Sequence, residues 1–296
     1  MTSIKNVAVL GAGGNLGPSI VEALLDAKFN VTVLSRHSST NTFPSAVQVR
    51  KVDYNSESSL IEDLRGQDAV VSVLGSAGLA SQKTVVDAAV KAGVQRFIPS
   101  EFGVDTQALE GSPLATLLKD KTDTTEYLKN VSSQHTGFSW TGIATNLFFD
   151  WGLRVGSLGF SIPNKTATII DSGNEPFFGT NLKAIGLAVV SVLQHPETSN
   201  RYLRVSSFTT TQNELLSILE SESGGQWTVS KEAADERRKT GEENLAKGDR
   251  SAFGNLLKDF VFRDGSGHGS PVGGFANKEL GLPEEVLKET IKNVLK

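Results

Sequence analysis

The sequence predicts an α/β protein built on a Rossmann-type, doubly wound parallel sheet. Short apolar runs alternate with amphipathic segments through the first half of the 296-residue chain, which is the pattern of βαβ units. The first run, Val7 to Leu10, passes directly into a glycine-rich stretch, and an amphipathic segment from Ser19 to Ala27 follows. The order strand, tight turn, helix is the context in which glycine-rich fingerprints bind dinucleotides.

The glycine-rich stretch Gly11-Ala12-Gly13-Gly14-Asn15-Leu16-Gly17 is expected to bind a pyrophosphate. Gly11 allows the tight turn, Gly14 lets a phosphate approach the backbone, and Gly17 lets the helix pack closely on the strand. The free N–H groups at the start of the helix, together with its dipole, then attract the phosphates. A plain glycine turn is the alternative. A Walker phosphate loop is excluded, because no Lys-Ser/Thr pair follows Gly17.

The second predicted strand, Asn30 to Ser35, ends in Arg36 with hydroxyl groups nearby, including Ser38. In dinucleotide-binding folds this strand end meets the adenosine ribose. An acidic residue there binds the 2′-hydroxyl of NAD, and a basic residue accommodates the 2′-phosphate of NADP. The planar guanidinium of Arg36 suits a phosphate, and no acidic residue stands beside it, so NADP is favoured over NAD. A solvated surface arginine is the alternative.

Two further predicted strands, Val47 to Val52 and Ala69 to Leu74, contribute their carboxyl ends to the same edge of the sheet. Asp53 either lies near the adenine or serves as a turn or cap residue. The small residues from Gly75 to Gly78 let a cofactor lie against the backbone, so Leu74 and Gly75 are assigned to the cofactor site. The remaining elements predicted before residue 100 are the helices Ser56 to Arg65 and Leu79 to Ala92 and a fifth strand, Arg96 to Pro99.

Composition excludes several classes of function. The net charge of −4, from 29 basic and 33 acidic residues, gives no indication of a nucleic-acid surface. The absence of cysteine excludes disulfides, thiolate catalysis and cysteine metal sites. No apolar run is long enough to span a bilayer and no signal sequence is recognised, so we expect a cytoplasmic protein without a membrane partner. We further expect a monomer or homodimer that binds no nucleic acid. The histidines show no metal-ligand spacing: His37, His135, His195 and His268.

Lys121 is the candidate general acid or base. A helix is predicted from Ser112-Pro113 to about Val131, and Lys121 follows Leu117 by four residues and Leu118 by three, on its apolar stripe. Burying an ammonium is costly and lowers the pKa of a lysine, which makes it a usable proton donor or acceptor. A lysine extending from the helix edge into solvent is the alternative. No tyrosine has a lysine four residues on, so the Tyr-x-x-x-Lys pair of short-chain dehydrogenases is absent.

The second half is less regular. A sixth strand, Phe138 to Ala144, precedes Asn146, Phe148 and Phe149 at the end where α/β sheets bind ligands. We expect a cofactor domain over residues 1–152, to which 182–206 return, and a smaller interlaced α/β substrate region over 153–296. Gly265 to Ser270 is interpreted as a surface connection or a lid. Further predicted elements are strands at 160–163, 166–170 and 202–205, helices at 182–194, 213–222 and 251–262, a turn at 171–174, a charged helical face within 230–248, and a last helix from Pro283.

The stretch from Gly93 to Gly103 resembles the signature of the isoflavone reductase, phenylcoumaran benzylic ether reductase and NmrA-like group of atypical short-chain dehydrogenases. The segments Gln82 to Ala89, Thr141 to Trp151 and Asn213 to Leu216 resemble further parts of that group, so the resemblance spans nearly the whole chain. It implies an NADP-binding fold. It also implies a catalytic role for Lys121, which matches the frame of the group's catalytic lysine, although Thr124 replaces the usual branched apolar residue.

The resemblance also implies the remaining site residues. The nicotinamide is expected beside Phe102, Asn146 and Phe148, and the other residues assigned to NADPH are Gln82, Pro99, Ser100, Glu101 and Lys121. Aromatic side chains suggest an apolar substrate pocket, unless they are simply core: Phe102, Phe149, Trp151, Phe177 and Phe178. The predicted activity is hydride transfer from NADPH to a small aromatic, secondary-metabolite-type substrate. The alternatives are a non-catalytic dinucleotide sensor that binds a protein partner, and a non-redox isomerase or cyclase.

Overall fold

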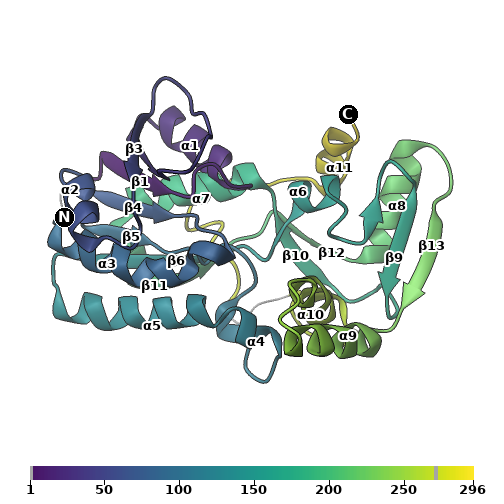
Figure 1. Cartoon of the computed structure of the whole chain (residues 1–296). Coiled ribbons are helices and arrows are strands. Elements are labelled where there is room, and N and C mark those ends of the chain that lie inside the picture. Colours follow the sequence, from purple (N-terminus) through teal and green to yellow (C-terminus); the bar gives the residue numbers. More distant parts are fainter. Residues whose placement is uncertain (1–2, 270–272) are drawn as a thin grey trace.

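The computed structural model describes residues 3–269 and 273–296, and its centre is a seven-stranded parallel sheet (Figure 1). The strand order is β11-β6-β5-β4-β1-β2-β3, so the direction of winding reverses between β1 and β4. This is the Rossmann arrangement with one strand added, and the fold class predicted from the sequence is confirmed. The strands are β1 (Asn6–Leu10), β2 (Asn30–Arg36), β3 (Gln48–Val52), β4 (Ala69–Ser72), β5 (Arg96–Ile98), β6 (Ser139–Ala144) and β11 (Arg201–Arg204).

Helices cover both faces of this sheet. Val7 and Val9 of β1 lie in the core beneath α1 (Gly17–Asp26) and α7 (Leu182–Gln194), which pack on each other (Figure 1). Ala8 and Leu10 lie in the opposite core, and all four side chains are fully buried. Burial on both faces explains the continuous apolar runs of the central strands. The helices of the second face are α2 (Glu57–Leu64), α3 (Gln82–Lys91) and α5 (Lys119–Gln134).

The rest of the chain forms a smaller unit with its own core and two three-stranded mixed sheets, drawn to the right in Figure 1. The chain leaves the main sheet after β6, returns through α7 and β11, and leaves it again. One sheet contains β7 (Leu147–Phe148), β10 (Phe177–Thr180) and β12 (Phe208–Thr210), and the other β8 (Phe160–Ser161), β9 (Thr166–Ile170) and β13 (Thr228–Glu232). The helices are α6 (Phe149–Arg154), α8 (Gln212–Ser223), α9 (Ala234–Ala246), α10 (Ser251–Phe262) and α11 (Leu287–Leu295).

Several predicted elements are corrected. The sequence did not indicate β7, β10, β12 or β13, because strands this short depend on pairing with distant segments. The single helix predicted after Ser112 is broken at Leu118 into α4 (Leu114–Leu117) and α5, and the last helix begins at Leu287 and not at Pro283. The helix predicted from Leu79 begins as a 3-10 turn, η1 (Ser76–Ser81), and two more such turns are η2 (Thr106–Ala108) and η3 (Pro196–Thr198). Ser270 lies outside the described residues.

Within residues 3–269 and 273–296, no helix combines the length and the apolarity needed to cross a membrane. The same residues contain no group of three or more histidine, aspartate or glutamate side chains arranged to hold a metal ion.

Candidate active site

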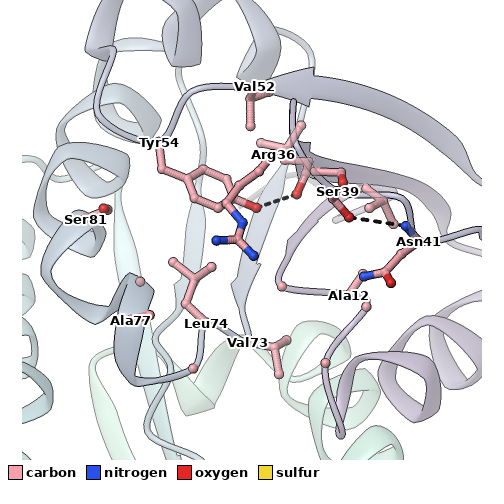
Figure 2. A pocket seen from close by; sticks show the side chains of 18 of the residues that line it. Ala12, Arg36, Ser39, Asn41, Val52, Tyr54, Val73, Leu74, Ala77 and Ser81 are labelled. Carbon is pink, nitrogen blue, oxygen red and sulfur yellow. Dashed lines mark hydrogen bonds between the residues drawn. The ribbon is translucent and has the colours of Figure 1, made fainter.

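A cavity of about 720 Å³ opens at the carboxyl ends of β1, β2 and β4, at the reversal of strand order (Figure 2). Open α/β sheets bind ligands at this position. The cavity brings together residues that the sequence placed in one cofactor site: Gly11, Gly13, Gly14, Arg36, Ser38, Asp53, Leu74 and Gly75. Asn15, Leu16 and Gly17 do not line it and lie at the start of α1.

The glycine-rich loop is shaped by close backbone contacts. Gly11 has φ +75°, and a Cβ atom there would lie 2.4 Å from the carbonyl oxygen of Val73. The N–H of Gly14 donates to the carbonyl oxygen of Gly11 at 3.0 Å and closes the turn. A Cβ atom on Gly17 would lie 2.2 Å from the carbonyl oxygen of Ala12, so this glycine packs the helix start against the loop itself. Any other residue at Gly11 or Gly17 would displace the loop.

Arg36 extends into the cavity between Tyr54 and Leu74 (Figure 2). None of the described carboxylates forms an ion pair with its exposed guanidinium, so Arg36 brings an uncompensated positive charge to the end of β2. Tyr54 donates a hydrogen bond to the carbonyl oxygen of Leu34 at 2.6 Å, and burial raises the pKa of this phenol. A guanidinium beside a glycine-rich loop suits a phosphate group that lies outside the pyrophosphate.

Asp53 has the turn role that the sequence left open. Its Oδ1 atom accepts a hydrogen bond from the N–H of Asn55 at 2.9 Å, while the residue also lines the cavity. A contact with adenine stays a prediction.

Gln82 and Ser100 connect the ends of β4 and β5. The N–H of Ser100 donates to Oε1 of Gln82 at 2.8 Å, and the Ser100 hydroxyl donates to the carbonyl oxygen of Leu74 at 2.6 Å. Nε2 of Gln82 is buried without a hydrogen-bond partner in the described part of the chain. These contacts connect Gln82 and Ser100 to Leu74, which lines the cavity. A direct contact of Gln82, Pro99 or Ser100 with a cofactor stays a prediction.

Lys121 extends inward from the first turn of α5 toward the signature loop. Its Nζ atom lies 3.3 Å from the carbonyl oxygen of Glu101 and 3.2 Å from that of Phe102, and donates to both. Burial lowers the pKa of Lys121, and the negative charge of Glu101 partly opposes this effect. Lys119, two residues earlier, instead points outward and pairs with Asp123 at 2.6 Å.

Asn146 contacts the same signature loop through its backbone. Its N–H donates to the carbonyl oxygen of Gly103 at 2.8 Å, and its Nδ2 atom donates to that of Phe178 at 2.8 Å. The residue is buried and has φ +50°, a left-handed conformation that asparagine tolerates better than most residues. Strained backbone held by surrounding contacts is typical of functional sites. Residues 101–103 therefore connect Lys121 and Asn146.

A second cavity, of about 300 Å³, extends from Asn146 into the smaller unit. His268 lines it and stacks on Phe260, with ring centroids 3.7 Å apart, and burial lowers the pKa of this imidazole. Arg204 lines it as well and pairs with Asp105. Sequence reasoning did not find these residues as site candidates, because they come from β11, α10 and two loops and share no local motif. The lining is Asp105, Gln107, Ala108, Asn146, Phe178, Arg204, Phe260, Ser266, Gly267 and His268.

The aromatic residues predicted for the substrate pocket are separated by the structure. Phe178 lines the second cavity, whereas its neighbour Phe177 faces the core and packs on Phe262 at 4.9 Å between ring centroids. Successive strand residues point to opposite faces, which explains this difference. Phe149 is also fully buried, against Phe208, and Phe148 packs edge-to-face on Trp151. Phe102 is buried in the core of the main sheet. For these residues a substrate contact stays a prediction.

Comparisons with known proteins agree with this architecture. The sequence model of the NmrA-like family matches residues 3–239. The oxidoreductase aprR of Aspergillus flavus is 39% identical over 98% of both chains, and the oxidoreductase poxI of Penicillium oxalicum is 36% identical over 80% of this chain and 76% of that protein.

Among solved structures, AtPrR2 with NADP+ and (+)pinoresinol superimposes with a TM-score of 0.81 at 20% identity, covering 99% of this chain and 100% of that one. The binary complex of leucoanthocyanidin reductase with NADPH from Vitis vinifera gives a TM-score of 0.81 at 19% identity, covering 98% and 99%. These structural likenesses show a common fold.

Proposed function

This chain belongs to the NmrA-like family, and we propose that it is an NADPH-dependent reductase that transfers a hydride to a small aromatic substrate. The observation that carries the proposal is the uncompensated Arg36 at the end of β2, in the same cavity as the glycine-rich loop. Two relatives are named oxidoreductases, and two structures of the same fold contain NADP+ or NADPH, which supports the choice of cofactor.

Two features of the first cavity support this cofactor, namely the glycine-rich loop and the positive charge of Arg36. The glycine-rich loop would hold the pyrophosphate against backbone N–H groups, and Arg36 would bind the 2′-phosphate. When bound, NADPH supplies the hydride. The signature loop and Asn146, which also lines the second cavity, would then support the nicotinamide.

Lys121 would act as the general acid. Its ammonium donates a proton to the substrate atom on which negative charge develops as the hydride arrives. Because burial lowers the pKa of Lys121, its ammonium is a stronger acid than an exposed one. The backbone carbonyls of Glu101 and Phe102 fix the direction of the Nζ atom.

The second cavity would hold the substrate. A volume of about 300 Å³ is at the lower end of small-molecule sites. The rings of Phe178 and Phe260 offer faces or edges to a flat aromatic group, and His268 and Arg204 offer polar contacts. A non-catalytic dinucleotide sensor would not need an inward-facing lysine and a second cavity, which favours an enzyme. The names of two relatives, both oxidoreductases, favour a reductase over a non-redox isomerase.

The test measures cofactor binding and turnover separately. Fluorescence titration is expected to show tighter binding of NADPH than of NADH. Purified protein is then incubated with NADPH and a panel of aromatic ketones, enones and benzylic ethers, and at least one compound is expected to be reduced as NADPH is consumed. Equal affinity for the two dinucleotides would remove the role of Arg36. No consumption across the panel would favour the dinucleotide sensor.

A further inference from the structure

We propose that the side-chain amide of Asn41 donates a hydrogen bond to the pyrophosphate of the bound dinucleotide, a role that rests on the proposed function for the identity of the ligand. Asn41 belongs to the segment between β2 and β3, outside both the glycine-rich motif and the strand ends from which the sequence indicated a cofactor site. The pyrophosphate would thus have a side-chain donor in addition to backbone N–H groups.

The Asn41 side chain occupies the space that a side chain on Gly13 would fill. A Cβ atom on Gly13 would lie 1.8 Å from Nδ2 of Asn41 and 2.6 Å from its Cγ atom. Both residues line the first cavity, and in Figure 2 the Asn41 side chain lies beside Ala12. The absence of a Cβ atom at Gly13 therefore lets the amide approach the backbone of the glycine-rich loop closely.

The Asn41 amide has its hydrogen-bonding capacity available for a ligand. Among residues 3–269 and 273–296, only the backbone N–H of Asn41 forms a hydrogen bond, and its Nδ2 and Oδ1 atoms form none. An amide group carries two N–H donors, and hydrogen bonds to a charged acceptor are about twice as strong as those between neutral groups. A phosphate oxygen against the glycine-rich loop is therefore a favourable acceptor for this amide.

Contacts on both sides of Asn41 fix the segment that carries it. The N–H of Ser39 donates to the carbonyl oxygen of Arg36 at 3.0 Å, and Nζ of Lys51 on β3 donates to the carbonyl oxygen of Ser39 at 2.6 Å. The Asn41 N–H donates to Oγ of Ser39 at 3.4 Å. Phe43, two residues later, packs against the core of the main sheet. The amide is thus positioned before a ligand binds, which lowers the entropic cost of binding.

Asn41 and Arg36 are placed for different phosphates. Arg36 extends into the cavity from the end of β2, where the 2′-phosphate is expected (Figure 2). Asn41 lies against Gly13, in the loop expected to hold the pyrophosphate. NADPH and NADH share the pyrophosphate and differ in the 2′-phosphate. Loss of the Asn41 amide should therefore weaken the binding of both dinucleotides by the same factor, whereas loss of Arg36 weakens the binding of NADPH alone.

The experiment is a fluorescence titration of the intact protein with NADPH and with NADH. Asn41→Ala is expected to weaken the binding of both about tenfold, the contribution of one charge-assisted hydrogen bond. Asn41→Asp keeps the shape of the side chain but replaces the donor by a negative charge, so a larger loss is expected for both. Thr42→Ala is the matched control, because Thr42 is exposed and does not line the cavity, and it should leave both affinities unchanged.

A third probe separates the two phosphates. Adenosine 2′-monophosphate carries the 2′-phosphate but no pyrophosphate, and isothermal titration calorimetry measures its affinity. Asn41→Ala should leave this affinity unchanged. An equal loss of affinity for adenosine 2′-monophosphate and for NADPH would overturn the proposal, because Asn41 would then act on the adenosine end of the cofactor.

Unchanged or tighter binding of the dinucleotides in Asn41→Ala would also overturn the proposal, as would an equal loss in Thr42→Ala. Outcomes for the two proposals stay distinct. NADPH binding that is independent of Asn41, in a protein that reduces a compound of the panel, ends this inference alone. Dinucleotide binding that depends on Asn41, in a protein that reduces no compound of the panel, ends the reductase proposal alone. A wild-type protein that binds neither dinucleotide ends both.

Discussion

The two ends of the candidate site are built in different ways. At the glycine-rich end, consecutive residues from Gly11 to Gly17 form the loop through backbone contacts, and Arg36 adds one charge. At the other end, Glu101, Lys121 and Tyr202 come from three distant segments. The Lys121 side chain donates to the backbone carbonyl of Glu101, and the Tyr202 hydroxyl donates to the carboxylate of Glu101. The first end is therefore specified locally, whereas the second exists only when the main sheet is complete. Substitutions are expected to separate cofactor binding from proton transfer along this division.

Replacing Lys121 gives the largest expected effect on activity. Lys121→Ala removes the proton donor but no group of the first cavity, so turnover should fall by about 10²- to 10⁴-fold, or about 3–5 kcal/mol of barrier, while NADPH affinity is retained. Single-turnover kinetics and fluorescence titration measure the two quantities. Lys119→Ala, which removes an exposed lysine of the same helix, is the control and should be neutral. Full activity in Lys121→Ala would show that the two ends do not divide the work in this way.

Backbone packing at the glycine-rich end predicts the next largest effect, on stability. Gly11→Ala forces a side chain into φ +75° and places its Cβ atom 2.4 Å from a carbonyl oxygen, so the free energy of unfolding should fall by about 3 kcal/mol. Gly66→Ala is the matched control. Gly66 has φ +77° with open space around it, so only the conformational cost of about 1 kcal/mol is expected. Urea denaturation measures both free energies of unfolding. Equal decreases in the two variants would mean that the close approach to Val73 does not contribute to the cost of Gly11→Ala.

The sequence predicted the locally specified end well. The glycine-rich loop and the end of β2 were assigned from short local motifs, and the structure brings Gly11, Gly13, Gly14 and Arg36 into one cavity, whereas residues 15–17 lie outside it at the start of α1. Long amphipathic helices were also predicted correctly from the sequence: α7 and α10 have the predicted bounds. Helical spacing also placed Lys121 on the inward stripe, although the helix is broken at Leu118, because α5 alone carries Lys121 toward residues 101–102.

The other end was not predictable beyond single residues. Glu101 and Tyr202 are separated by 101 positions and meet because β11 pairs with β6, a pairing that no local pattern encodes. The second cavity has the same origin, since Arg204 and His268 reach it from separate segments. Phe177 and Phe178 show most clearly what the local sequence pattern could not predict. They lie on β10, a strand that the sequence did not indicate, so which of the two faces a cavity was not decidable.

Arg36 gives a smaller, selective effect. Arg36→Ala should weaken NADPH binding by about ten- to hundredfold, the value of a charge-assisted hydrogen bond of roughly 1.5–3 kcal/mol, and leave NADH binding unchanged. Fluorescence titration with both dinucleotides is the measurement. Arg65→Ala is the control, since Arg65 is exposed, lies outside the cavity and pairs with Glu62. A parallel loss of NADPH and NADH affinity would indicate damage to the fold and not the loss of a phosphate contact.

The smallest expected effect concerns the stability cost of Lys121. Its pKa in the fold lies below the ordinary value of 10.5, so the folded protein disfavours the ammonium, and wild-type stability rises as pH increases from the folded pKa toward the unfolded one. Lys121→Met should therefore raise the free energy of unfolding by about 1 kcal/mol at neutral pH, with the gain vanishing above about pH 10.5.

Thermal unfolding of both proteins across this pH range measures the difference, in which groups common to both cancel. In a Glu101→Gln background the gain should be larger, because the carboxylate that partly offsets burial is gone. A gain independent of pH would trace the effect to packing of the methionine. A lower free energy of unfolding in Lys121→Met would mean that the fold stabilises the Lys121 ammonium. The attraction of the Glu101 charge for the ammonium would then exceed the cost of burying it.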